Sequence, residues 1–265
     1  MDNYFIPIII TGAFAGISIG LLGVLIVGMR MPFIGSCISH TAMVGAVYAS
    51  LLGIDPMAGA VALSMAGSVG AVFIPPNRKN LDANTGQAIL LSFMMGLVFL
   101  AVGLEQGSRS EMLSLLWGNV LFADWCTVFI TGSLTLLLLV FMVVFDKELK
   151  AILFSRSLAM VTGKHTGLVY FLFLCFCGLI LAVNLKAVGG LLIFSLLVCP
   201  AAAAYQVCRG YNAVVLFSLL FGVLSTVLGF SISYFLNMPT GACIVITSSL
   251  IFAASSLFVS IRKRD

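Results

Sequence analysis

The sequence has little charge. Only 8% of its 265 residues are Asp, Glu, Lys or Arg, whereas 62% are hydrophobic. A soluble domain carries about 25% charged residues, so this composition excludes an ordinary water-soluble domain. The formal net charge is +4, but the basic residues are scattered at segment ends and form no patch or stripe, which excludes a nucleic-acid surface. We interpret residues 1–265 as a single polytopic membrane domain.

Catalytic and cofactor-binding motifs are also missing. The seven cysteines include no C-x-x-C pair and lie in or beside apolar stretches, so we interpret them as small buried hydrophobes. Gly163-Lys164 is followed by His165 rather than by Ser or Thr, so the phosphate-loop pattern fails. The sequence has two histidines, no H-E-x-x-H motif and no carboxylate pair within an apolar run. We therefore expect neither enzyme activity nor a resident cofactor.

Long apolar runs are what the sequence has instead. A helix that crosses the hydrocarbon core needs about 20 mostly apolar residues, and all its backbone polar groups must bond internally. These rules predict an all-α membrane bundle of about nine spans, near residues 4–28, 32–52, 57–75, 86–104, 125–145, 166–184, 187–208, 211–236 and 239–261. The second span is the least regular, because Pro32 and Gly35 could delay its start or make it partly re-entrant.

The distribution of basic residues predicts the orientation. With nine spans, one side of the membrane receives every Lys and Arg except Arg109 and Lys186. Cytoplasmic loops are enriched in Lys and Arg, so that side is predicted to be cytoplasmic, with the N-terminus outside and the C-terminus inside. The acidic residues that then face outward form either ordinary solvated loops or a weakly anionic mouth that attracts cations. They include Asp55, Glu105, Glu111 and Asp124.

The predicted spans contain almost no ionisable side chain apart from His40. Proton- or sodium-coupled carriers usually keep acidic or basic residues in their membrane core. The energy for pumping must therefore come from another polypeptide, or the protein is a passive pore. Cys37 and His40 share one helix face, and thiol and imidazole suit soft or borderline divalent metals. His40 is thus either a transient metal ligand or a residue that bonds a neighbouring helix and stiffens the bundle.

Residues 146–165 form the longest loop on the predicted cytoplasmic side. Leu149, Ile152, Leu153 and Leu158 are interleaved with polar residues, and Gly163 suits a helix end, so we predict a short amphipathic helix here. Such a helix lies either on the lipid surface or in a groove of a cytosolic partner. The pattern alone leaves both open.

Several segments, in chain order, resemble the permease subunits of ABC importers for divalent metals, the zinc, manganese and iron class. They are Arg30-Met31-Pro32-Phe33-Ile34-Gly35 with Ser39-His40, Leu116-Trp117-Gly118-Asn119, Val188-Gly189-Gly190-Leu191-Leu192 with Leu197-Val198-Cys199-Pro200-Ala201-Ala202, and Met238-Pro239-Thr240-Gly241. The set covers nearly the whole chain. Related permeases for siderophores and cobalamin are longer, so the length favours the metal class.

The resemblance implies a type II-like importer fold in the bacterial plasma membrane. Two copies of such a permease would form the pathway as a homodimer, cytosolic ATP-binding-cassette ATPase subunits would drive it, and an extracytoplasmic metal-binding protein would deliver the ion. The segment from 149 to 163 would then seat in a cleft of the ATPase. Its expected contacts are Phe154, Arg156, Leu158 and Gly163, on a helix that also carries Leu149, Ile152 and Leu153.

One residue departs from the family pattern. Many members carry Asp at the position four residues before the histidine, where this chain has Ser36. We therefore keep Ser36, Cys37, Ser39 and His40 as residues that line the transport path, with His40 as a transient ligand, and we leave the metal open. The alternatives are a siderophore or cobalamin permease, and a stand-alone channel or secondary carrier.

Overall fold

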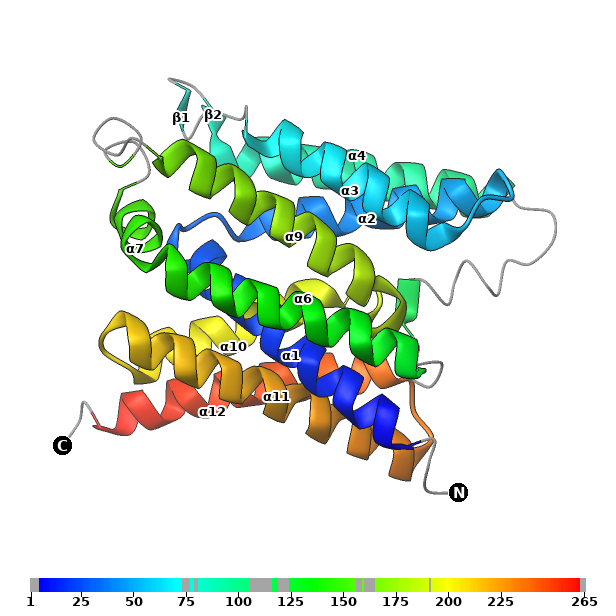
Figure 1. Ribbon diagram of the computed structural model, residues 1–265. Coiled ribbons are helices and arrows are strands. Elements are labelled where there is room, and N and C mark those ends of the chain that lie inside the picture. The colour runs from blue at the N-terminus through cyan, green and yellow to red at the C-terminus, as the bar shows by residue number, and fades with distance from the viewer. Residues whose placement is uncertain are drawn as a thin grey trace.

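The computed structural model describes residues 5–72, 77–78, 81–104, 116–118, 124–155, 159, 165–190 and 192–262. These residues form ten helices and a two-stranded antiparallel hairpin (Figure 1). The helices are α1 (Phe5–Gly28), α2 (Pro32–Leu51), α3 (Pro56–Val72), α4 (Ala83–Leu104), α6 (Trp125–Val144), α7 (Asp146–Phe154), α9 (Thr166–Val188), α10 (Ile193–Val207), α11 (Tyr211–Leu236) and α12 (Thr240–Arg262). Strands β1 (Asn77–Arg78) and β2 (Leu81–Asp82) form the hairpin.

The helical class predicted from the sequence is confirmed. Every predicted span coincides with one helix, and α7 lies in the predicted cytoplasmic loop. Seven helices are long and apolar enough to cross a membrane. Helices α3 and α10 have 17 and 15 residues, fewer than the roughly 20 that a full crossing needs, so the count of nine spans stays a prediction. The short hairpin was not predicted.

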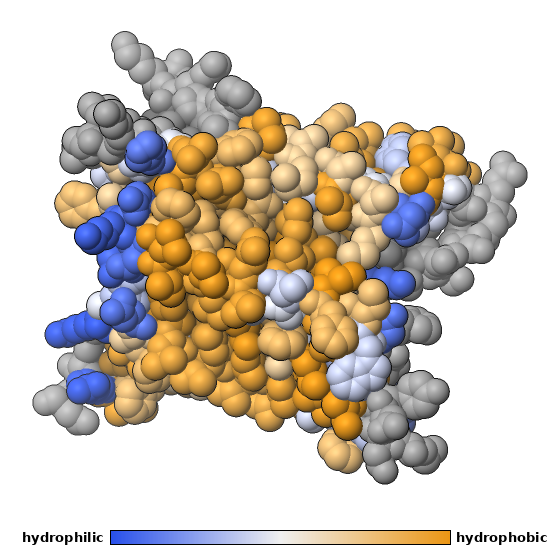
Figure 2. All heavy atoms as spheres, in the orientation of Figure 1, coloured by the Kyte–Doolittle hydropathy of each residue, from blue (hydrophilic) through white to orange (hydrophobic). Residues whose placement is uncertain are grey.

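The surface of the bundle carries a broad apolar band. Figure 2 shows hydrophobic side chains across the middle of the molecule and polar side chains at its left and right ends. On α6, Phe129 is 73% exposed and Val143 is 76% exposed. A contiguous apolar surface is unfavourable in water, whereas lipid chains solvate it. The band therefore indicates that the helices run across the membrane along the horizontal direction of this view.

Helices α1, α2 and α9 form the inner part of the bundle. The best apolar windows of α1 and α9 are each 67% buried and that of α2 is 83% buried, compared with 17% for α4 and 28% for α12. Helix α1 packs against α6, α9, α10 and α11, and Ser218 Oγ on α11 donates to the Gly20 carbonyl of α1 over 2.8 Å. The interior position of α2 places its polar residues deep inside the protein.

One predicted boundary is wrong. The apolar pattern predicts one span that ends at residue 184 and another that begins at 187, because Asn184 and Lys186 interrupt the apolar run. Helix α9 instead continues to Val188. Asn184 Nδ2 donates to the Ile180 carbonyl over 2.8 Å, so the amide is accommodated within the helix. The helix ends at Gly189, whose φ of 89° lies in the left-handed region that favours glycine.

The two ends of the bundle carry different elements. Helix α7 and the β1–β2 hairpin lie at the left end in Figure 1, and the C-terminal end of α9 lies at the right end. Helix α1 begins at the right and α12 ends at the left. The first and last helices therefore point their outer ends to opposite sides of the bundle.

Candidate functional site

Helix α2 carries the residues predicted to line a transport path. Pro32 occupies its first turn, where the missing N–H costs no helical hydrogen bond, so the helix starts at the proline and is continuous to Leu51. The delayed or re-entrant alternative for this span is therefore not what the structure contains. Ser36, Ser39 and His40 are 3%, 0% and 5% exposed. The helix packs against α3, α4 and α9.

His40 is held by its own helix. Its Nδ1 atom lies 2.8 Å from the Ser36 carbonyl oxygen. A carbonyl oxygen can only accept, so Nδ1 carries the proton of this hydrogen bond and, in the neutral ring, Nε2 keeps its lone pair. That nitrogen is the atom through which an imidazole in this tautomer binds a metal. The geometry thus leaves His40 chemically able to act as a ligand.

The other path residues point to different neighbours. Ser39 Oγ donates to the Gly190 carbonyl over 3.0 Å, and Cys37 Sγ lies 3.5 Å from the Gln87 carbonyl oxygen on α4. Among the described residues, no group of three or more His, Cys, Asp or Glu side chains could hold a metal ion. The structure therefore brings Ser36 and His40 together but does not gather the four predicted residues into one site.

Segments that are far apart in the sequence meet beside α2. A side-chain carbon on Gly118 would collide with the backbone of Val188 and Gly189, and one on Gly189 would collide with the backbone of Trp117 and Gly118. Gly118 and Gly189 have φ angles of 71° and 89°, which other residues rarely adopt. Only glycine fits both requirements here. We call this contact between residues 116–118 and 188–190 the glycine junction.

The glycine junction also joins α2 and α12. Ser39 of α2 bonds the Gly190 carbonyl, and a side-chain carbon on Gly241, at the start of α12, would lie within 3.1 Å of the Val188 carbonyl oxygen. All four segments that carry the family resemblance therefore converge here. Three of the segments supply backbone to this packing point, and the α2 segment supplies the Ser39 hydroxyl.

Two of the predicted outer acidic residues are described, and both cap helices. The Asp55 carboxylate accepts the Ala58 N–H over 3.0 Å, and Asp124 accepts the Thr127 N–H over 2.8 Å and its hydroxyl over 2.6 Å. The Thr127 hydroxyl, then its N–H, lowers the pKa of the Asp124 carboxyl. Both residues are exposed, so capping does not remove them as attractors of cations. Glu105 and Glu111 lie outside the described residues.

The predicted amphipathic helix is α7, and its apolar face is already occupied. Leu149 and Ile152 are 1% and 4% exposed, because α7 packs against α1, α6 and α9. Leu153 is half-buried. Phe154, at the last turn, is 88% exposed. Of the described members of the predicted coupling set, only Phe154 is therefore open to a partner, whereas Arg156, Leu158 and Gly163 lie outside the described residues.

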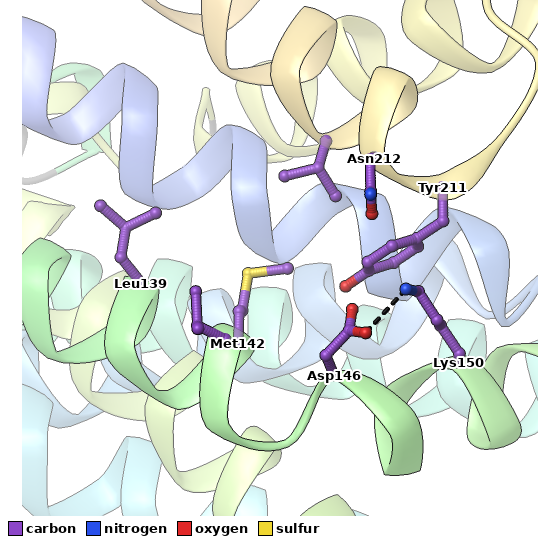
Figure 3. Close-up of a pocket in the computed structure, with 8 residues that line it drawn as sticks. Leu139, Met142, Asp146, Lys150, Tyr211 and Asn212 are labelled. Carbon is purple, nitrogen blue, oxygen red and sulfur yellow. Dashed lines mark hydrogen bonds and ion pairs between the residues drawn. The ribbon is translucent and has the colours of Figure 1, made fainter.

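A cavity of about 370 Å³ lies beside α7 (Figure 3). Lys150 Nζ is 2.7 Å from the Asp146 carboxylate on the same helix and 4.9 Å from the centre of the Tyr211 ring on α11. Figure 3 shows the Tyr211 ring and the Asp146 and Lys150 side chains pointing toward one another among the residues that line the cavity. These contacts tie α7 to α11 through side chains, and the sequence did not predict them because the two residues are remote along the chain.

Sequence reasoning also missed Gln87. This residue is 0% exposed at the start of α4 and its carbonyl oxygen faces Cys37 of α2. A polar residue just inside an apolar span is a signal for function in a membrane protein, and that signal was present in the sequence. The sequence did not distinguish this buried amide from a solvated one, because amides close to a helix end are often exposed to water.

Comparisons with known proteins agree with this geometry. The features above are those of a polytopic membrane transport protein. The manganese import system permease protein ScaB of Streptococcus gordonii is 28% identical over 97% of this chain and 91% of the relative. The high-affinity zinc uptake system membrane protein ZnuB of Haemophilus influenzae is 26% identical over 96% of this chain and 97% of the relative.

A solved structure and a protein family complete the comparison. The structure of PsaBC from Streptococcus pneumoniae in complex with Fab has a TM-score of 0.83 and 26% identity, and the match covers 96% of this chain and 91% of that chain. Residues 1–259 match the ABC 3 transport family. The chain belongs to this family. It is accordingly a transport component rather than an enzyme, and a multi-pass protein of the bacterial inner membrane.

Proposed function

We propose that this chain is the membrane-spanning permease subunit of an ABC importer for divalent metal ions such as zinc, manganese or iron. Two copies would form the path, and separate cytosolic ATPase subunits would drive it. The observation that carries the proposal is the match to the ABC 3 transport family over residues 1–259. Relatives named for manganese import and for zinc uptake, each aligned over more than 90% of this chain, support a metal as cargo.

The lack of an internal energy source supports an external ATPase. No aspartate or glutamate lies within any of the seven described spans. A secondary carrier usually needs such residues for its proton or sodium relay. An ATPase that binds the inner face would supply the energy that this polypeptide cannot. A stand-alone channel or carrier is therefore the weaker alternative.

The path itself is proposed to run along α2. His40 offers Nε2 and Cys37 offers a thiol, both of which suit borderline divalent ions, and Ser36 and Ser39 add polar groups. The absence of a carboxylate at position 36 favours weak and transient contact. An extracytoplasmic metal-binding protein would deliver the ion, and Asp55 and Asp124, with Glu105 and Glu111, would make its mouth attractive to cations.

Coupling is proposed to use the segment that begins with α7. Burial of Leu149 and Ile152 anchors the helix to the bundle, while the exposed Phe154 would contact the ATPase together with Arg156, Leu158 and Gly163. Nine spans with the N-terminus outside would put this segment in the cytoplasm. The position of the outer end of α12 on the same side as α7 (Figure 1) supports that orientation, because Arg262 and the following basic residues then lie inside.

Competition in an uptake assay tests the cargo. The permease is reconstituted with its ATPase and binding protein, and uptake of radioactive manganese or zinc is measured with excess unlabelled metal, ferric siderophore or cobalamin. Only the unlabelled divalent metals should compete. Competition by siderophore or cobalamin alone would instead favour the related importer class and reject a metal-ion cargo.

A further inference from the structure

One face of α4 packs against α2, and it is apolar except for the amides near its start. Helix α4 makes its main helix contact with α2, and Met95, Val98 and Ala101 on one of its faces pack into the hydrophobic core, with the half-buried Leu91 one turn before Met95. One turn before Leu91, the same face carries Gln87, which is 0% exposed. A glutamine in this position interrupts an otherwise apolar contact.

Among the residues that the structure describes, the Gln87 amide has no hydrogen-bond partner. Neither its Nε2 nor its Oε1 atom makes a hydrogen bond, and the Oδ1 atom of Asn84, one turn earlier, is also buried without a partner. Asn84 Nδ2 is used, since it donates to the Arg30 carbonyl over 3.3 Å. Buried polar atoms are nearly always paired, and an exception calls for a functional explanation. A leucine would fill the same space without the cost of burying an amide.

These amides lie between His40 and one end of the bundle. Cys37, one turn from His40 toward the start of α2, lies 3.5 Å from the backbone carbonyl oxygen of Gln87, which places the base of the Gln87 side chain beside this turn of α2. Asn84 contacts Arg30, in the turn before α2. A cation that moves from His40 toward the Arg30 end would therefore meet Cys37, then Gln87, then Asn84. In the proposed orientation this end is cytoplasmic.

We propose that the amide oxygens of Gln87 and Asn84 form an oxygen-donor station through which a divalent cation passes on its way from His40 to the cytoplasm. This inference rests on the proposed function, and it names the ligand chemistry of the cytoplasmic half of the proposed transport path. Amide oxygens are hard ligands that suit manganese, whereas imidazole and thiol alone favour zinc. Because the amides are neutral, they can replace water around the ion without holding it by charge, which suits release.

The test replaces the amide without changing its volume much. The complete importer is reconstituted with Gln87→Leu, with Gln87→Glu, or with the control Gln206→Leu, which alters an exposed glutamine on α10. Initial uptake of Mn²⁺ and of Zn²⁺, each alone, is measured together with the thermal midpoint of the complex. We expect Gln87→Leu to lower Mn²⁺ uptake about tenfold, the loss expected for about 1.4 kcal/mol of lost stabilisation, and to lower Zn²⁺ uptake less.

The variants separate a transport role from a structural one. Gln87→Leu should keep or raise the thermal midpoint, since it removes unpaired buried atoms, and Gln87→Glu should retain more Mn²⁺ uptake because it restores an oxygen donor. The inference is overturned if Gln87→Leu transports both ions as the control does, or if both uptakes fall equally with a lower midpoint. Failure of the unaltered complex to take up either ion would overturn the proposed function instead.

Discussion

The two ends of this bundle are held together in different ways. At the glycine junction, backbone packs directly on backbone, and no side chain separates residues 116–118 from 188–190. At the opposite end, α7 is attached through the side chains of Leu149, Ile152 and Lys150 beside an open cavity. Close backbone contacts leave little room for adjustment, whereas flexible side chains can change partners. We infer that the junction fixes α2, α9 and α12 relative to one another, and that movement is absorbed near α7.

The largest expected effect is at the glycine junction. Gly189→Ala places a side chain at a φ of 89°, which costs about 1–3 kcal/mol before any collision is counted, and the new carbon would also overlap residues 117 and 118. The variant should therefore lose most of its folded, monodisperse protein in detergent. The matched control is Gly96→Ala on α4, where a side-chain carbon meets nothing within 4 Å. Equal thermal midpoints for the two variants would contradict the inference that close backbone packing at the glycine junction stabilises the fold.

A pair of substitutions on α7 sharpens the comparison at the other end. Leu149→Asp buries a carboxylate at a position that is 1% exposed, so it should destabilise the fold by at least about 2 kcal/mol. Phe154→Asp changes a side chain that is 88% exposed, so the fold should persist while metal uptake and permease-stimulated ATP hydrolysis are lost. Thermal unfolding and ATPase assays measure the two effects. Normal uptake by Phe154→Asp would contradict the docking role.

His40 tests the path next to the junction. Loss of its imidazole removes the best ligand on α2 but leaves a cavity that neighbours can partly fill, so His40→Ala should express normally. Uptake should fall roughly tenfold, as expected when about 1.4 kcal/mol of stabilisation is lost. Uptake and membrane yield are measured on the same samples. An unchanged uptake rate would assign His40 to packing alone.

The Lys150 contacts should matter less. The ion pair with Asp146 is partly exposed, with side-chain exposures of 42% and 38%, and such pairs contribute at most about 0.2–1 kcal/mol. Lys150→Gln should therefore lower the thermal midpoint slightly at low salt and hardly at all at high salt. A large loss of stability at both salt concentrations would mean that α7 is held more rigidly than we infer.

The smallest expected effect is on stability at acid pH, and it concerns Asp124 at the start of α6. Hydrogen bonds from Thr127 lower the pKa of Asp124 below its ordinary value of 3.8. Its contribution to stability is therefore complete above that value and is lost as the pH falls through the lower pKa of the folded state. Asp124→Asn should weaken the acid dependence of unfolding below about pH 4. Stability at neutral pH should change little, because the Asn side-chain oxygen caps a helix about as well as the Asp carboxylate. An identical acid profile in the variant would argue against this cap.

Much of the fold was predictable because lipid imposes simple rules. The apolar runs identified the seven described helices that are long and apolar enough to cross a membrane, since length and hydropathy decide crossing regardless of the partners. The error at residues 184–187 arose because Asn184 satisfies its amide within α9, which hydropathy cannot reveal. The amphipathic pattern identified α7, but it could not tell whether Leu149 faces the bundle or a partner. That choice depends on tertiary packing.

The site was less predictable than the fold. His40 and its neighbours were found because ionisable residues in apolar spans are rare, and Gln87 was missed because an amide near a helix end is common. The convergence of the motif segments at Gly118 and Gly189 depends on contacts between residues far apart in the chain. No local pattern contains that information, although the resemblance selected the same segments.

We infer that this chain is a passive path powered by ATPase subunits bound at its α7 end. The most direct measurement uses sealed vesicles that contain the permease alone, the permease with its ATPase, or the complex with Phe154→Asp, each supplied with metal and the binding protein. Accumulation of Mn²⁺ or Zn²⁺ against a gradient should require the unaltered complex and ATP. Accumulation by the permease alone would contradict the account.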